Sequence, residues 1–198
     1  FRVFVSPVGP YYKGAGMAVI SLAVSEIDRA APRGTGSYKV GANYAGGLLA
    51  TRQAQELGAN EALYLDASEN RYIDEAGSAN ILVVMNDGTL VTPKSDAILP
   101  SITRRSIMEF AKDQLGMNTQ ERPIDLRAEL SNFQEMAACG TAAVLSPVGK
   151  LYFDDQWHSV YGDGSEVGPV MQKVYDTLVG IQKGEVSDGF GWTHEVKI

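Results

Sequence analysis

Length, composition and charge set the first limits on function. The chain has 198 residues, 44% hydrophobic and 21% charged, which is the composition of a globular protein with a buried core. Its formal net charge of −7 argues against nucleic acid or a membrane as a partner, because anionic surfaces are bound by basic faces. The single cysteine, Cys139, permits no internal disulfide and suits the cytoplasm, where we expect the protein. The two histidines stand far apart, without nearby Cys or paired carboxylates at ligand spacing, so we predict no metal site.

The first half of the chain is predicted to contain mostly strands, with one helix. Residues 1–5 and 17–24 have the apolar patterns of strands. Residues 43–57 contain helix formers and are followed by Gly58, a residue typical of a helix C-terminus. On this helix we expect one buried face, formed by Tyr44, Leu48, Thr51, Ala54 and Leu57. Further strands are predicted at 62–65, 80–85 and 90–92, with a hairpin turn at 86–88.

The second half is predicted to mix helices and strands. Helical spacing indicates a long helix through about residue 115, opened near 99–103, and a last helix at 167–182. Between them we expect the following shorter elements: a strand at 119–122, a helix at 126–130, and strands at 135–138, 142–146 and 150–153. The chain has no strict βαβ repeat, which favours an α+β fold.

Residues 33–44 concentrate glycine around one lysine, Lys39. Glycine permits tight bends and close approach of other groups. A phosphate-binding loop needs Gly directly before the lysine and Ser or Thr directly after it, and Tyr38 and Val40 stand there instead. Lys39 is therefore either an ordinary solvated lysine or a desolvated amine that attacks a carbonyl and forms a Schiff base.

The string Gly-x-x-Lys-Val-Gly-x-Asn-Tyr at 36–44 resembles the cofactor-lysine segment of branched-chain amino acid aminotransferases, which are fold-type IV pyridoxal-phosphate enzymes. The resemblance implies an α+β, mixed-sheet, barrel-like large domain of the D-amino acid aminotransferase-like fold. It also implies pyridoxal 5'-phosphate as cofactor, bound to Lys39, which would be the catalytic proton carrier. Residues 6–12 resemble the family's interdomain connection. We therefore expect residues 1–12 to end an interdomain strand and linker, 13–198 to form the large domain, and a smaller N-terminal domain to precede the chain.

Two further strings resemble family motifs that bind the cofactor. Residues 75–80 match Glu-x-Gly-x-x-Asn, which implies that Glu75 keeps the pyridine nitrogen protonated and that Ser78 lines the same pocket. Residues 99–104 resemble Leu-Pro-Gly-Ile-Thr-Arg, with Ser101 in place of the glycine. The resemblance implies that Leu99 packs against the ring and that the N–H groups of Ile102 and Thr103 bind the phosphate.

The remaining implied site residues lie at a turn and at a helix start. The Gly-Thr-Ala string at 140–142 resembles a family turn whose N–H groups, here those of Thr141 and Ala142, bind the substrate carboxylate. The Thr141 hydroxyl would reach the phosphate, and Tyr44 would bind the phenolic oxygen of the cofactor. Taken singly, each assignment has an ordinary alternative. Glu75 is also compatible with a solvated loop acid, residues 99–104 with a helix start capped by Ser101, and Tyr44 with a core residue at a helix start.

The resemblance implies a transaminase that moves the amino group of leucine, isoleucine or valine to 2-oxoglutarate. Small-molecule amino acids and 2-oxo acids are then the ligands, and a homodimer is the expected assembly. A D-amino acid aminotransferase or an aminodeoxychorismate lyase of the same fold is the alternative. A cofactor-binding fragment without activity is the alternative of a different class.

Overall fold

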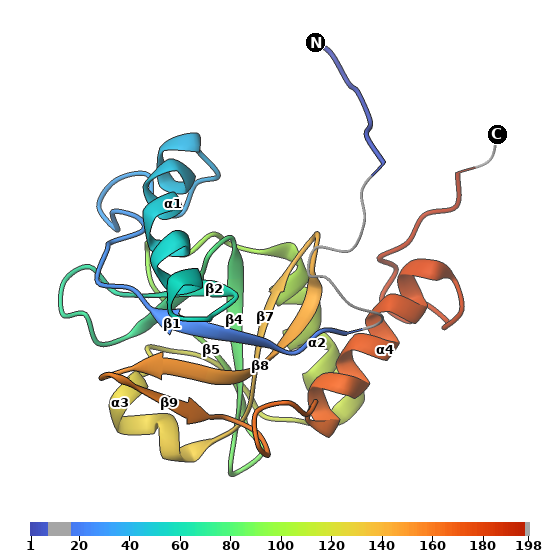
Figure 1. Ribbon diagram of the computed structural model, residues 1–198. Helices are drawn as coiled ribbons and strands as arrows, with labels where there is room; N and C mark the ends of the chain where they lie inside the picture. Colours follow the sequence, from blue (N-terminus) through green and yellow to red (C-terminus); the bar gives the residue numbers. More distant parts are fainter. Residues whose placement is uncertain (8–16, 197–198) are drawn as a thin grey trace.

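The computed structural model describes residues 1–7 and 17–196 (Figure 1). At its centre a mixed sheet closes on itself, because β3 pairs with β4 as well as with β2. The strands of this ring are, in spatial order, β1 (Ile20–Val24), β2 (Glu61–Leu65), β3 (Ile73–Ala76), β4 (Ala79–Met85), β7 (Phe133–Gly140) and β8 (Val144–Phe153). β1 is parallel to both of its neighbours, β2 and β8, whereas the other pairs around the ring are antiparallel. The ring and its helices confirm the predicted barrel-like α+β fold.

Short strands and helices are added to this ring. β5 (Leu90–Thr92) pairs with β4, β6 (Thr119–Glu121) with β5, and β9 (Gln156–Ser159) with β8. The helices are α1 (Gly41–Glu56), α2 (Ile102–Leu115), α3 (Leu126–Glu129), followed by the short 3₁₀ helix η1 (Leu130–Asn132), and α4 (Pro169–Lys183). Figure 1 shows α1 on one side of the ring and the neighbouring helices α2 and α4 on another. Within the described ranges, no helix is long and apolar enough to cross a bilayer.

Side chains of β4 alternate between two apolar clusters, one on each face of the strand. Ile81 and Val83 belong to the apolar cluster inside the ring, whereas Leu82 and Val84 pack in the cluster that includes α2 and α4. Successive strand residues point to opposite faces, so Asn80 lies on the same face as Leu82. This outer face leads to the N-terminus of α2, where the candidate site lies.

The predicted buried face of α1 is wrong in part. Ala54 is buried, but Leu48 is 73% and Leu57 45% exposed. The helix packs on β1 and β2 through small side chains, in a cluster that contains Ala23, Ala50, Ala54, Ala59, Ala62 and Tyr64. Leucines on this face would hold the helix farther from the sheet, so close packing selects alanines and leaves the leucines outside.

Two predictions about strands need correction, and one hairpin was missed. Residues 1–5 are exposed and form no strand, because they pair with no other segment in the described part of the chain. The predicted strands at 142–146 and 150–153 are one continuous strand, β8. The hairpin from β8 to β9 was not predicted; it turns at Asp154 and Asp155, which both adopt positive φ, a conformation more common for Asp than for most residues. The expected boundary between 1–12 and 13–198 falls outside the described residues.

Candidate functional site

Four segments that are distant in sequence meet around one cavity of about 340 Å³. They are the end of the loop before α1, the turn between β3 and β4, the N-terminus of α2, and the turn between β7 and β8. Six of the predicted site residues line this cavity: Lys39, Ser78, Leu99, Ile102, Thr141 and Ala142. The structure thus brings together the segments that sequence motifs selected separately.

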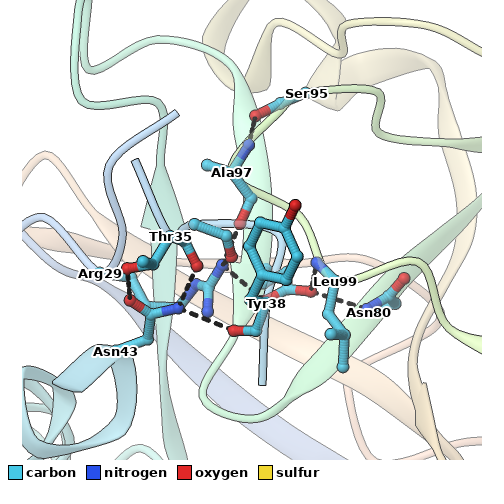
Figure 2. Close-up of polar contacts among 10 residues, drawn as sticks. Arg29, Thr35, Tyr38, Asn43, Asn80, Ser95, Ala97 and Leu99 are labelled. Carbon is cyan, nitrogen blue, oxygen red and sulfur yellow. Dashed lines mark hydrogen bonds and ion pairs between the residues drawn. The ribbon is translucent and has the colours of Figure 1, made fainter. Parts of the chain in front are cut away.

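Residues 33–39, called here the lysine loop, are fixed to the start of α1 by Asn43. The buried side chain of Asn43 donates from Nδ2 to the carbonyl oxygens of Thr35, at 2.8 Å, and Tyr38, at 2.9 Å. Thr35 Oγ1 donates to Asn43 Oδ1 at 3.3 Å (Figure 2). These bonds satisfy backbone groups of an irregular segment and so define the backbone just before Lys39.

Close packing on the other side of the lysine loop requires a glycine at position 36. A Cβ built on Gly36 would lie 2.6 Å from the carbonyl oxygen of Ala31 and 2.8 Å from Cα of Ala97. Both distances are shorter than van der Waals contact, and both atoms are backbone atoms, which cannot rotate away. The lysine loop therefore rests directly on the segment that leads into α2.

Lys39 is exposed at the cavity edge, and its amine lies over an aromatic ring. Nζ is 5.3 Å from the ring centroid of Tyr44, a cation–π distance. Tyr44 is half-buried in the first turn of α1, and it does not itself line the cavity. The structure therefore brings the two predicted residues into contact with each other.

Glu75 is buried behind the cavity and makes contacts with both of its carboxylate oxygens. Oε1 accepts hydrogen bonds from Asn80 Nδ2 and from the backbone N–H of Leu99, each at 2.8 Å. Oε2 lies 2.9 Å from Nη2 of Arg29. Burial raises the pKa of Glu75 to about 7, and the positive charge of Arg29 opposes that rise. Arg29, Asn80 and Leu99, which Figure 2 shows next to one another, thus all contact this carboxylate.

The turn that follows Glu75 also depends on a glycine. Gly77 has φ of +52°, and a Cβ on it would lie 2.4 Å from Cδ of Glu61. Most side chains are strained at this φ, and here one would also collide with Glu61. The turn carries Ser78 to the cavity wall and pairs Asn80 with Glu75 across the hairpin.

The N-terminus of α2 provides anion-binding groups at the cavity. Ser101 is the N-cap, and its Oγ accepts the N–H of Arg104 at 3.2 Å. The N–H groups of Ile102 and Thr103, in the first turn, have no acceptor within the helix, because α-helical N–H groups bond to the residue four positions earlier. Together with the helix dipole, these groups favour a bound anion. Thr103 is half-buried and is not among the cavity-lining residues.

The turn between β7 and β8 forms the opposite wall. Thr141 and Ala142 are exposed at its tip, and Val144, directly after it, has φ of +56°, which is strained for a β-branched residue. Cys139 lines the cavity from β7 but is fully buried, and burial raises the pKa of its thiol to about 12. This thiol is therefore protonated at neutral pH and is a poor nucleophile.

The sequence profile of the family described as "Amino-transferase class IV" matches residues 3–151. The chain belongs to this family. A branched-chain-amino-acid aminotransferase of Haemophilus influenzae is 44% identical over 202 aligned residues, which cover 100% of this chain and 58% of that protein. This member of the class IV aminotransferases thus spans a little over half the length of the curated relatives it matches.

Solved structures of other aminotransferases share the fold. The branched-chain amino acid aminotransferase of Escherichia coli matches with a TM-score of 0.81 at 34% identity, covering 94% of this chain and 59% of that chain. The enzyme of Thermobaculum terrenum in its PLP-form matches with a TM-score of 0.75 at 26% identity, covering 86% and 53%. Another branched-chain amino acid aminotransferase, complexed with N-(5'-phosphopyridoxyl)-L-glutamate, matches with a TM-score of 0.75 at 31% identity, covering 88% and 55%. These matches agree with the fold class that the sequence resemblance implied.

Sequence reasoning missed three residues that organise this candidate site. Asn43 and Asn80 stand inside the recognised motifs, but a motif match gives no hydrogen-bond partner. Arg29 lies outside the motifs that we used. Its two backbone partners, the carbonyl oxygens of Gly36 and Ala97, are 7 and 68 positions away in the sequence. Its only signal was an arginine in the mixed stretch of residues 26–33, which contains two acids and a second arginine and is too common to be specific.

Proposed function

We propose that the gene product containing this chain moves the amino group of leucine, isoleucine or valine to 2-oxoglutarate, with pyridoxal 5'-phosphate as cofactor. The observation that carries the proposal is the convergence of Lys39, the N-terminus of α2 and the turn at Thr141 on one cavity, with the Glu75 carboxylate behind it. The substrate class is supported by relatives named branched-chain-amino-acid aminotransferase.

The chemistry of the donor set fits a phosphorylated pyridine aldehyde. The first turn of α2 offers N–H groups to a phosphate, Lys39 offers an amine to an aldehyde, and Glu75 offers a carboxylate to a ring nitrogen. Among the described residues, Oδ1 of Asn80 is buried without a hydrogen-bond partner, so the cavity wall retains one free acceptor. When bound, the cofactor supplies an electron sink for the charge left at the substrate Cα.

In this proposal Lys39 is the catalytic residue. Its amine would hold the cofactor through the aldehyde carbon and would carry the proton that leaves the substrate Cα. The ring of Tyr44 lies beneath the amine, and its hydroxyl would bind the phenolic oxygen of the cofactor. The lysine loop is held by Asn43, which limits the positions that Nζ explores.

The other roles follow from the elements that carry each residue. Glu75 would accept the pyridine N–H and hold that proton in place, because the charge of Arg29 favours the ionised carboxylate and charge-assisted hydrogen bonds are strong. Ile102 and Thr103 would bind phosphate oxygens through their N–H groups, and the side chain of Leu99 would pack against the ring. At the exposed turn, N–H groups of Thr141 and Ala142 would bind the substrate carboxylate, and Ser78 lines the same cavity.

A glutamate adduct in a related structure supports the second substrate. One structurally similar aminotransferase was solved with N-(5'-phosphopyridoxyl)-L-glutamate, and glutamate is the product expected when 2-oxoglutarate accepts the amino group. We also propose that residues 1–12 link this domain to a smaller N-terminal domain and that the protein is a homodimer. Walls contributed by a second domain would exclude water from the cavity.

The test is an amino-transfer assay on the gene product that contains this chain. Purified protein is incubated with pyridoxal phosphate, 2-oxoglutarate and one amino acid, and glutamate formation is measured. We expect leucine, isoleucine and valine to be used, and D-alanine not to be used. Activity with D-alanine alone would instead favour a D-amino acid aminotransferase, and no transfer with any amino acid would contradict the proposal.

A further inference from the structure

Arg29 connects the lysine loop with Glu75, although no motif marks it. The residue is buried, with 8% of its surface exposed. Its Nη2 lies 2.9 Å from Glu75 Oε2 and also donates to the carbonyl oxygens of Gly36, at 3.3 Å, and Ala97. Figure 2 shows these contacts between Arg29 and the surrounding segments. One guanidinium therefore touches the lysine loop, the β3 carboxylate and the segment before α2.

The three segments are already in close contact at this point. Gly36 packs against Cα of Ala97, and Leu99, two residues later, donates its N–H to Glu75 Oε1. Burial of a guanidinium is unfavourable unless an opposite charge and hydrogen-bond acceptors compensate it. Arg29 has both kinds of partner here, and each of them belongs to a segment of the candidate site.

We propose that Arg29 is a positioning residue that holds the lysine loop against Glu75 and so fixes the amine of Lys39 relative to that carboxylate. The catalytic meaning of this arrangement rests on the proposed function, because the roles of Lys39 and Glu75 do. Loss of Arg29 would free the carbonyl of Gly36 and leave the Glu75 carboxylate without its nearest cation. Both consequences are measurable without cofactor or substrate.

The first consequence concerns the charge state of Glu75. The charged groups that act on it are Arg29, Asp74 on its own strand, and Arg104 from α2. Asp74 raises the pKa of Glu75 in the same direction as burial, whereas the two arginines lower it. Arg104 is paired with Glu121 at 2.8 Å, so Arg29 is the principal compensating charge. Removing an opposite charge at this distance raises the pKa of a carboxyl by roughly 1–3 units.

The second consequence concerns the lysine loop. Arg33 and Lys39 are exposed trypsin sites within it, and cleavage there requires local opening of the loop. Loss of a hydrogen bond from a charged donor is expected to raise the rate of such opening by about tenfold or more. The contacts of Asn43 remain, so the loop is loosened without being released from α1.

The experiment compares Arg29→Gln, Arg29→Lys and the control Arg122→Gln, all without cofactor. Arg122 is a partly buried arginine whose side chain pairs with Glu129 at 2.6 Å, away from the cavity. Carboxyl-¹³C-labelled glutamate, with the Glu75 signal identified by its loss in Glu75→Gln, gives the pKa of Glu75 by NMR. Limited trypsin digestion with mass analysis gives the cleavage rates after Arg33 and Lys39.

We expect Arg29→Gln to raise the pKa of Glu75 by at least about one unit and to accelerate lysine-loop cleavage about tenfold or more. Arg29→Lys retains the charge and should leave the pKa of Glu75 within about half a unit of wild type. Arg122→Gln should change neither quantity. If Arg29→Gln does not fold, Arg29→Lys alone decides. A shifted pKa of Glu75 together with fast lysine-loop cleavage in Arg29→Lys would contradict the charge argument. An unshifted pKa of Glu75 would support it.

Unchanged pKa and unchanged cleavage in folded Arg29→Gln would overturn the proposal. Equal acceleration of cleavage in Arg122→Gln would also overturn it, because the effect would then be general destabilisation. Failure of the proposed function has a different signature. Amino transfer would then be missing, while these two properties of the cofactor-free chain would still depend on Arg29.

Discussion

Asn80 stands directly opposite Glu75 in the β3–β4 hairpin and donates its Nδ2 to the Glu75 carboxylate at 2.8 Å. The same oxygen receives the N–H of Leu99, so a hairpin and the approach to α2 are joined through one buried acid. A buried carboxylate is stable only with such partners. The position of Glu75 is therefore determined by strand register and not by a flexible loop.

Replacing Glu75 with Gln should reduce turnover roughly ten- to hundredfold while cofactor still binds. A neutral amide does not hold the pyridine nitrogen protonated, and loss of a charged hydrogen bond costs about 1.5–3 kcal/mol. The measurement is kcat for leucine and 2-oxoglutarate, with bound cofactor followed by absorbance.

Glu135→Gln is the matched control for Glu75→Gln. Glu135 is equally buried, and its carboxylate accepts the N–H groups of Val170, at 3.0 Å, and Met171, at 2.9 Å, at the start of α4. This variant should lose stability but retain kcat, because α4 does not line the cavity. Unchanged turnover in Glu75→Gln would mean that Glu75 is only a structural acid.

Replacing Asp74 with Asn should stabilise the chain at pH 8 by about 1–3 kcal/mol. Oδ1 of Asp74 is buried without a hydrogen-bond partner in the described part of the chain, and burial raises the pKa of this residue from 3.8 to about 6. A raised folded-state pKa means that wild-type stability, relative to the Asn variant, is highest below about pH 4 and declines as pH rises through about 6. Urea unfolding at a series of pH values measures this difference.

Asp66→Asn provides a control of opposite sign. Asp66 accepts backbone N–H groups of Glu69, Arg71 and Tyr72, and these bonds, with that from Ser68, hold its pKa below the usual range. Its substitution should destabilise the chain at pH 8, and the loss should diminish as pH falls toward the folded-state pKa. If both variants shifted stability in the same direction at pH 8, burial of Asp74 would not be the cause.

Replacing Gly36 with Ala should destabilise the chain by about 1–3 kcal/mol and disturb the lysine loop. The new Cβ would meet backbone atoms of Ala31 and Ala97 at 2.6 and 2.8 Å. Gly46→Ala is the control, since nothing lies within 4 Å of its Cβ, and alanine in a helix is favoured over glycine by about 0.5–1 kcal/mol. Urea midpoints should therefore move in opposite directions. A neutral Gly36→Ala would refute the close packing of the loop.

The sequence predicted well those elements whose signals are local. α2 has a serine N-cap, a helical apolar face and Gly116 at its C-terminus, and the β4–β5 hairpin has a strong turn signal. The buried face of α1 could not be predicted, because the sheet beneath it selects small residues over leucines. That selection depends on tertiary distance, which the periodicity of one helix does not contain.

The candidate site was predicted through motif resemblance, and its internal connections were not. Lys39, Ser78 and Thr141 were selected separately, and the structure brings them to one cavity. Arg29 was missed because its partners, Glu75 and Ala97, lie far away in sequence. The sequence around a single basic residue before a glycine-rich segment does not reveal which residues its side chain contacts in the fold.

The central claim is that Lys39 bears the cofactor, and reductive trapping tests it most directly. The gene product is loaded with pyridoxal phosphate, reduced with borohydride, digested and analysed by mass spectrometry. We expect the phosphopyridoxyl group on Lys39, and no covalent adduct in Lys39→Ala. A stable adduct on Lys94 or Lys13, or full labelling of the Lys39→Ala variant, would contradict the account.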